Sequence, residues 1–399
     1  MRPMYGSRNV TALRRRFQFF AASGLLFVLM GCGAGATSAP IVLPTPPVSS
    51  LPTPKPKFAY TGNQGASLSG YAVDPSTGVL TPLSGFPVPV GLNPTIITHD
   101  PQNRFLIVGD NAAFMLHVYA IDPTTGALSE ISPSPYNTMI QPGAMVVDPS
   151  GTHLYLYRTG ASVAFPGVSG NQMFAYNLSS TGVLSAVKDM PLPIGSPGAQ
   201  YLPATGMAVT PSGTFLYLQD LFNLYAFKID AVSGALSVLQ SVPLPSQFGE
   251  GIALDPAGSY LYAADRDSLL AYGIDPVTGL LSLTKSTPQA RKGAYTLSLS
   301  PNGNFAYTIE NSTDLVSYSV SGGAFVPLGI YPGVFGLQIS VDPSGGFVYV
   351  PQACSSNCPG GAYTLVHQFS ITKTGSLLPL PTPTVASGVT PFGITVTSQ

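Results

Sequence analysis

The sequence predicts an all-β fold, a seven-bladed β-propeller built from four-stranded antiparallel blades. From residue 57 onward a short pattern recurs with a period of about 45 residues, the length of one propeller blade. The 399 residues include 43 Gly and 40 Pro, and these punctuate short apolar runs, which is typical of strands joined by tight turns. The clearest marker of the repeat is an aromatic or apolar triplet: FAY at 58, FLI at 105, HLY at 153, FLY at 215, YLY at 260, FAY at 305 and FVY at 347.

Four strands are expected in each copy. The triplet opens the second strand, and an apolar first strand precedes it and ends in a turn such as VVDPSG (146–151). A third strand with an aromatic residue runs through a second turn into an apolar fourth strand, as in VYAIDPTTGAL (118–128). In these turns Asp caps, Pro presets φ and Gly takes the positive φ. Turn geometry therefore accounts for eight aspartates, which we do not expect to be catalytic: Asp74, Asp100, Asp122, Asp148, Asp230, Asp255, Asp275 and Asp342.

The repeat does not close in linear order. The first copy begins at FAYTGN (58–63) with no first strand before it, and the chain ends in FGITVTSQ (392–399), which matches a first strand without partners. A ring of blades leaves no long free sheet edge. We therefore expect residues 392–397 to supply the innermost strand of the first blade.

The N-terminus has the features of an export signal. Arg14 to Arg16 precede an apolar run that ends in LMGC (29–32), and the run is short for a membrane span. LMGC resembles a bacterial lipobox, which implies lipidation of Cys32; an ordinary signal or a membrane anchor are the alternatives. We expect a lipoprotein signal peptide at 1–31, Cys32 with a Pro/Ser/Thr-rich tether at 32–56, and the propeller at 57–399.

Localisation and partners follow from that organisation. Gly33, not Asp, comes after the cysteine, which by resemblance to known sorting signals favours the outer membrane of a bacterial cell envelope. The net charge of −1 gives no reason to expect a nucleic-acid surface. The membrane, reached through the N-terminal lipid, is the expected partner.

Strand order places the loops on two faces. Loops between first and second strands, and between third and fourth, share one face, the turn face, which holds the eight turn aspartates. The remaining loops share the opposite face, the loop face. Its charged residues are Asp110, Arg158, Asp220, Glu250, Asp265, Arg266, Asp267, Arg291, Lys292 and Glu310.

A chain with only 8% charged residues concentrates them on this loop face, so we take it as the candidate binding face. Arg158, Arg266 and Arg291, with Asp265, could hold a carboxylate or phosphate ligand. Glu250 or Glu310 could act as a base on a water that attacks a lactone, with Arg266 as a further weak catalytic candidate. The alternative is that these charges are solvated and pair with each other.

The blade phrases YAVDPSTGVLTPL, VVDPSGTHLYLY and SVDPSGGFVYV resemble the lactonase-type propellers, which include 6-phosphogluconolactonase-like and YVTN-repeat proteins. The resemblance covers residues 57–399. It implies an active site of His, Arg and Glu around the pore, with a Pro-His element entering one inner strand. Here the matching positions read NPT (93–95), QPG (141–143) and GEG (249–251), and no histidine falls in the loops of the loop face.

Three functions stay open at this point. The first is a lipid-anchored, non-catalytic module that binds a protein or glycan through its loop face. The second is a lactonase-like hydrolase that opens a sugar lactone or related cyclic ester, with a small lactone or acidic molecule as ligand. The third is a purely structural envelope protein. The missing Pro-His element favours the first.

Cysteines and metal ligands add little chemistry. Cys354 and Cys358 lie in one loop of an exported chain, which favours a disulfide over a redox pair or free thiols. A zinc site would lack ligands. A Ca²⁺ site at Asp265 and Asp267 is an alternative, but DRDS (265–268) lacks the longer acidic spacing of a calcium loop, so we expect no metal and no cofactor.

Overall fold

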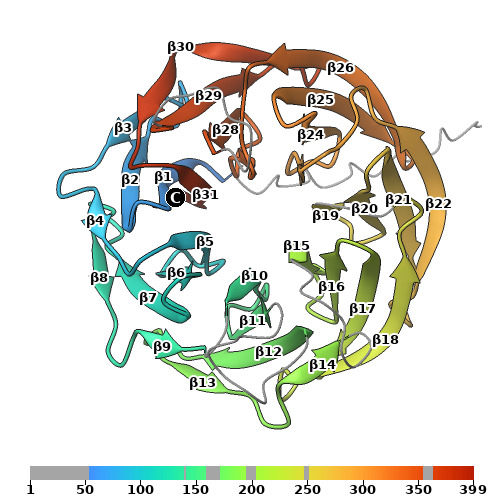
Figure 1. Cartoon of the computed structure of the whole chain (residues 1–399), viewed down its shortest axis with the longest axis horizontal. Coiled ribbons are helices and arrows are strands. Elements are labelled where there is room, and N and C mark those ends of the chain that lie inside the picture. The colour runs from blue at the N-terminus through green and yellow to red at the C-terminus, as the bar shows by residue number, and fades with distance from the viewer. Residues whose placement is uncertain (1–53, 139–140, 159–170, 195–203, 247–250, 354–362) are drawn as a thin grey trace, which may run out of the picture. The chain divides into compact units, whose positions relative to one another are not determined.

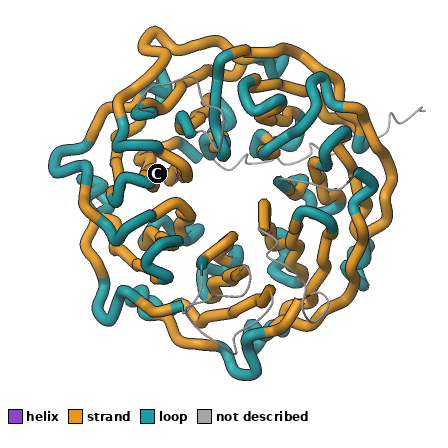
Figure 2. Tube along the Cα trace, viewed as in Figure 1, coloured by secondary structure: helices purple, strands orange, loops and turns teal. Residues whose placement is uncertain are grey.

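The computed structural model describes residues 54–138, 141–158, 171–194, 204–246, 251–353 and 363–399. Within these ranges the regular elements are strands, and seven antiparallel sheets stand in a ring (Figures 1 and 2). The expected seven-bladed propeller is therefore confirmed. No helix in the described ranges is long and apolar enough to cross a membrane.

Each blade presents its strands in the order first to fourth from the centre outward. The innermost strands, for blades 1 to 7, are β31 (Pro391–Ser398), β5 (Pro94–His99), β10 (Pro142–Val147), β15 (Ala204–Val209), β19 (Ile252–Leu254), β23 (Thr296–Leu299) and β27 (Ser340–Val341). The second strands are β1 (Pro56–Asn63), β6 (Phe105–Asp110), β11 (His153–Arg158), β16 (Phe215–Asp220), β20 (Tyr260–Ala264), β24 (Phe305–Glu310) and β28 (Phe347–Pro351).

The outer half of each blade varies more. The third strands are β2 (Ser67–Val73), β7 (Met115–Ile121), β12 (Asn171–Leu178), β17 (Asn223–Ile229), β21 (Ser268–Ile274), β25 (Asp314–Ser321) and β29 (Leu365–Ile371). Blades 4 to 7 have one long outer strand each: β18 (Leu236–Pro243), β22 (Leu281–Pro288), β26 (Ala324–Pro332) and β30 (Leu377–Ala386). In blades 1 to 3 the outer strand is split in two: β3 (Leu80–Pro82) and β4 (Val88–Pro89), β8 (Leu128–Glu130) and β9 (Tyr136–Asn137), β13 (Leu184–Ala186) and β14 (Leu192–Ile194). Prolines lie between the two pieces, and a proline has no N–H to continue a ladder.

The C-terminal strand closes the ring as expected. β31 pairs antiparallel with β1, with Ala59 opposite Val396 and Thr61 opposite Ile394. The Gln399 N–H also donates to the Lys55 carbonyl at 2.7 Å. Each innermost strand contacts the next one around the ring, and β31 contacts both β27 and β5. The last segment of the chain therefore completes the first blade.

Seven hydrophobic clusters fill the spaces between neighbouring blades. The third residue of the triplet is a buried tyrosine in six blades, and in five of these its hydroxyl donates to the carbonyl of a turn glycine in the following blade. The pairs are Tyr60 to Gly126, Tyr155 to Gly234, Tyr217 to Gly279, Tyr307 to Gly375 and Tyr349 to Gly78. Apolar packing and these bonds together align each blade with its neighbour.

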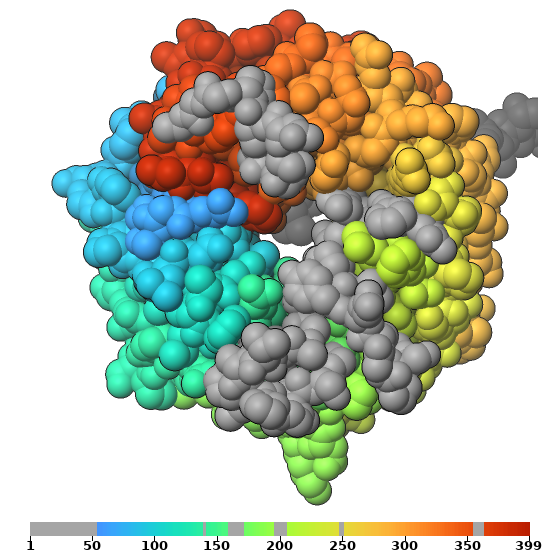
Figure 3. Space-filling model, viewed as in Figure 1, coloured from blue at the N-terminus to red at the C-terminus, as the bar shows by residue number. Residues whose placement is uncertain are grey.

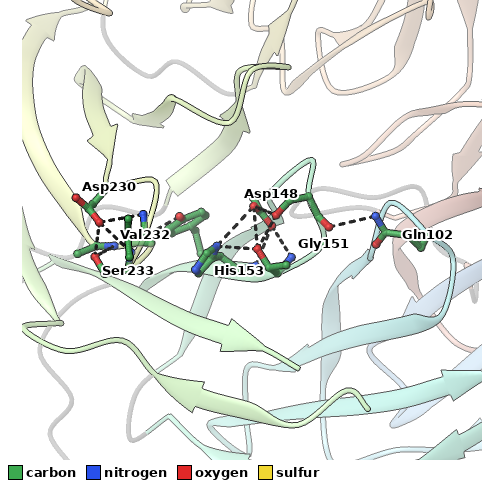
Figure 4. Close-up of polar contacts among 12 residues, drawn as sticks. Gln102, Asp148, Gly151, His153, Asp230, Val232 and Ser233 are labelled. Carbon is green, nitrogen blue, oxygen red and sulfur yellow. Dashed lines mark hydrogen bonds and ion pairs between the residues drawn. The ribbon is translucent and has the colours of Figure 1, made fainter. Parts of the chain in front are cut away.

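The turn aspartates form the bonds expected of them. The Asp230 carboxylate accepts hydrogen bonds from the Val232 and Ser233 N–H groups at 3.1 and 2.8 Å. The Asp148 carboxylate accepts from the Thr152 and His153 N–H groups, both at 2.8 Å. Figure 4 shows these two turns, from neighbouring blades, beside one another. These aspartates of the turn face therefore serve to hold the turns.

Candidate functional site

The loop face carries one polar residue per blade at the end of the second strand. Each of these residues lies five positions after the first residue of the triplet, and we call them the latch residues. They are Asn63, Asp110, Arg158, Asp220, Asp265, Glu310 and Gln352. Figure 3 shows the ring as a surface, with an opening near its centre.

Asp265 illustrates what a latch residue does. Its side chain is fully buried, and its Oδ1 atom accepts hydrogen bonds from the Asp267 and Ser268 N–H groups at 3.0 and 2.7 Å. Its Oδ2 atom accepts from the Ser246 N–H group at 3.1 Å. One carboxylate thus fastens the hairpin between second and third strands to the chain segment that leads into the same blade. The residue expected to bind a ligand has both oxygens engaged by backbone.

Blade 2 repeats this arrangement, and blade 4 repeats the part that holds the hairpin. The buried Asp110 carboxylate accepts from the N–H groups of Ala112 and Ala113 in its hairpin, and of Leu92 and Asn93 in the incoming segment. Asp220 accepts hydrogen bonds from two hairpin N–H groups and from the Tyr225 hydroxyl. A carboxylate that accepts several such bonds is held in one orientation.

Glu310, a candidate base, fills the latch position of blade 6. Its Oε2 atom accepts from the Arg291 N–H at 2.6 Å, and its Oε1 atom accepts from the Tyr318 and Thr308 hydroxyls at 2.6 and 2.8 Å. Burial raises the pKa of Glu310, while the bonds from Tyr318, Arg291 and Thr308 oppose that rise. A general base must reach the proton that it removes. Both oxygens of the buried Glu310 are already engaged by these donors, so this carboxylate acts as a structural acceptor.

The exposed charges gather at the boundary of blades 5 and 6. The Arg291 Nε atom lies 3.4 Å from an oxygen of Asp314, and the Lys292 Nζ atom lies 3.1 Å from an oxygen of Asp267. Arg266 is exposed and has no ion pair among the described residues. The Gly293 N–H donates to the Arg266 carbonyl at 2.9 Å, which joins the two loops. We call Arg266, Arg291 and Lys292 the cationic patch, and it can attract an anion. The two ion pairs that Arg291 and Lys292 make are solvent-exposed, so each contributes little stability.

Arg158 lies apart from that patch, in blade 3. Its side chain is almost fully buried, and its Nη2 atom donates to the Gln172 Oε1 atom. The guanidinium carbon lies 4.9 Å from the ring centroid of Phe174. Burial lowers the pKa of Arg158 to about 10, with Tyr176 opposing the shift, so the group stays protonated at neutral pH. The structure therefore brings Asp265, Arg266 and Arg291 together, and it places Arg158 elsewhere on the face.

Other expected site residues lie outside the described residues, namely Glu250, Cys32, Cys354 and Cys358. Within the described ranges no three His, Cys, Asp or Glu side chains are grouped as metal ligands. His99 ends an innermost strand, His153 opens a second strand, and His117 and His367 lie in third strands. None of these four histidines occupies the loop face.

The latch role went unpredicted, although the sequence carried a signal for it. Counting five residues from each triplet finds a polar residue in every blade. A buried position at the end of a central strand is rarely charged without a partner. That count would have separated the buried Asp265 and Glu310 from the exposed Arg266 and Arg291.

Comparison with known proteins agrees with the propeller fold. The family model described as lactonase, 7-bladed β-propeller matches residues 52–147 and 168–298. No match is found among the curated proteins.

Solved structures share the fold at low sequence identity. A candidate 6-phosphogluconolactonase from Bacteroides uniformis has a TM-score of 0.71 and 16% identity, covering 86% of this chain and 99% of that one. A periplasmic gluconolactonase from Pseudomonas aeruginosa has a TM-score of 0.70 and 18% identity, covering 85% and 98%. A protein of unknown function from Desulfotomaculum acetoxidans has a TM-score of 0.66 and 12% identity, covering 86% and 99%. Likeness at such identities establishes the fold alone.

Proposed function

This chain belongs to the lactonase seven-bladed β-propeller family, and we propose that within this family it is a lipid-anchored, non-catalytic binding module. It engages a protein or glycan partner through its loop face. A shared propeller fold hosts many functions, so the site and not the fold must carry the argument.

The observation that carries the proposal is the use of the loop-face carboxylates. Asp110, Asp220, Asp265 and Glu310 are all buried, and each accepts hydrogen bonds from backbone or hydroxyl donors. Ester hydrolysis by general base catalysis needs a carboxylate or imidazole that reaches a water. In the described loops these four groups are engaged by those donors, and the partly exposed Asp267 pairs with Lys292. The cationic patch is exposed and suited to recognition.

Anchoring through Cys32 would suit such a module. Residues 54 and 55 lead into β1 at the end that carries the turn face, next to the C-terminal Gln399. A tether that joins the propeller there leaves the loop face on the side opposite its attachment. The outer membrane is the proposed location of the anchor.

The binding proposal can be tested with the lipidated full-length protein in detergent on an array of bacterial envelope glycans and envelope proteins. The triple variant Arg266→Ser, Arg291→Ser, Lys292→Ser should lose at least about tenfold of any retained signal, because it removes the cationic patch. The matched control Lys228→Ser, Lys285→Ser, Lys373→Ser removes three exposed charges from strands and the turn face and should retain binding. No wild-type signal on the array, or equal loss in both variants, would contradict the proposal.

A lactonase-like hydrolase is the second candidate. Family membership and the likeness to a periplasmic gluconolactonase favour it. Arg266 and Arg291 could then orient an anionic substrate, with Glu250 as the remaining acidic candidate. Turnover of a gluconolactone substrate that Glu250→Gln or Arg266→Ala abolishes would support this function instead.

A further inference from the structure

Blade 3 departs from the other blades at the latch position. Asparagine, aspartate, glutamate and glutamine each offer an acceptor oxygen, and one of these fills the position in six blades. Arginine has five N–H donors and no acceptor. Arg158 therefore cannot hold its hairpin and incoming segment by accepting N–H bonds, as Asp110 and Asp265 do. Blade 3 thus carries a cationic side chain at a position that holds a carboxyl side chain in four blades and an amide in two.

Among the described residues, the buried positive charge of Arg158 has no negative partner. The residue is 3% exposed, and no carboxylate of the described chain lies within ion-pair distance of it. Its contacts are the neutral Gln172 oxygen and the face of Phe174. The Nε–H group is buried and has no hydrogen-bond acceptor among the described residues. Burying a charge in this way is costly unless something compensates it.

The two neutral contacts hold the guanidinium in one orientation. Gln172 lies opposite Arg158 in the pairing of β11 with β12, and Phe174 follows two residues later on the same side of β12. Stacking on the Phe174 ring and a single hydrogen bond to the Gln172 amide oxygen fix the plane of the guanidinium and leave other N–H donors unused. An oxyanion with two oxygens matches such a planar fork by paired hydrogen bonds.

We infer that Arg158 is an oxyanion-binding subsite of the loop face, built for a carboxylate or phosphate group of the ligand. The inference rests on the proposed binding function and adds the chemical class of the group that is bound. Phe174 and Gln172 are positioning residues for the guanidinium. The bound oxyanion supplies, beside Arg158, the kind of acceptor oxygens that a carboxyl side chain supplies at this position in blades 2, 4, 5 and 6.

The test is a thermal melt of the full-length protein in detergent, with sodium phosphate, sodium D-glucuronate or sodium chloride added at equal ionic strength. Saturating phosphate or glucuronate should raise the wild-type Tm by at least about 2 °C over chloride. The two arms distinguish a phosphate from a carboxylate source. The Arg158→Met variant should show no such rise, and the charge control Lys373→Met should behave as wild type.

The same variant reports on folding without a ligand. In chloride, Arg158→Met should melt at or above the wild-type temperature, because it removes an uncompensated buried charge. No rise in the wild type with either anion, or an equal rise in wild type and Arg158→Met, would overturn the inference. A rise confined to the wild type without any partner on the envelope array would keep the subsite and reject the partner proposal.

Discussion

Glu310→Gln separates a structural carboxylate from a catalytic one. Three donors point at Glu310: the Arg291 N–H at 2.6 Å, the Tyr318 hydroxyl at 2.6 Å and the Thr308 hydroxyl at 2.8 Å. Glutamine keeps one oxygen and turns the other into an NH₂ donor. The glutamine orientation that loses least stability keeps its oxygen facing the Arg291 N–H. The Tyr318 and Thr308 hydroxyls then face the NH₂ group.

The magnitude follows from the bonds that are lost. A hydrogen bond to a charged group contributes about 1.5–3 kcal/mol, and two such bonds weaken. Relief of the desolvation that raises the pKa of Glu310 offsets part of this loss. We expect a net loss of about 2 kcal/mol in the free energy of unfolding, which corresponds to a Tm lower by roughly 4 °C.

Calorimetry on Glu310→Gln and on the control Asp267→Asn measures this difference. Asp267 is partly exposed and pairs with the exposed Lys292, so its substitution should change stability by less than about 0.5 kcal/mol. An unchanged melting curve for Glu310→Gln, together with lost binding or turnover, would refute the structural role of this carboxylate.

Three further outcomes test the ring and its closure. Tyr349→Phe removes a hydroxyl that donates to the Gly78 carbonyl at 2.6 Å and should cost about 1–2 kcal/mol by urea unfolding; an unchanged midpoint would count against the bond between blades. Burial lowers the pKa of His99 to about 4 from 6.5, so the folded state disfavours the proton and stability should fall by up to about 3 kcal/mol as the pH drops between those values. His99→Gln should flatten that part of the pH profile, and an equally steep profile would exclude His99 as its source. Deletion of residues 391–399 removes β31 and should abolish cooperative melting, whereas a cooperative transition would show that the first blade does not need this strand.

Local patterns were sufficient to predict the blades, because the triplets and the Asp-Pro turns are short-range features. The closure of the ring followed from counting strands at the two ends of the repeat. The latch residues depend on contacts between separate segments of one blade: Asp265 accepts from Ser246 and Glu310 accepts from Arg291, each 19 residues away. The motif DRDS shows acidic residues but not which N–H groups face them. Charge alone therefore grouped the buried Asp265 with the exposed Arg266. Arg158 was expected as a ligand residue, but its burial and its neutral neighbours become evident only in the folded chain.

The most direct test of the central claim is the rate of D-glucono-δ-lactone opening in the presence of the purified full-length protein. If the loop-face carboxylates are latches, the rate should equal the spontaneous one at every protein concentration and pH tested. Saturable turnover that Glu250→Gln or Arg266→Ala abolishes would contradict the account and make the chain an enzyme.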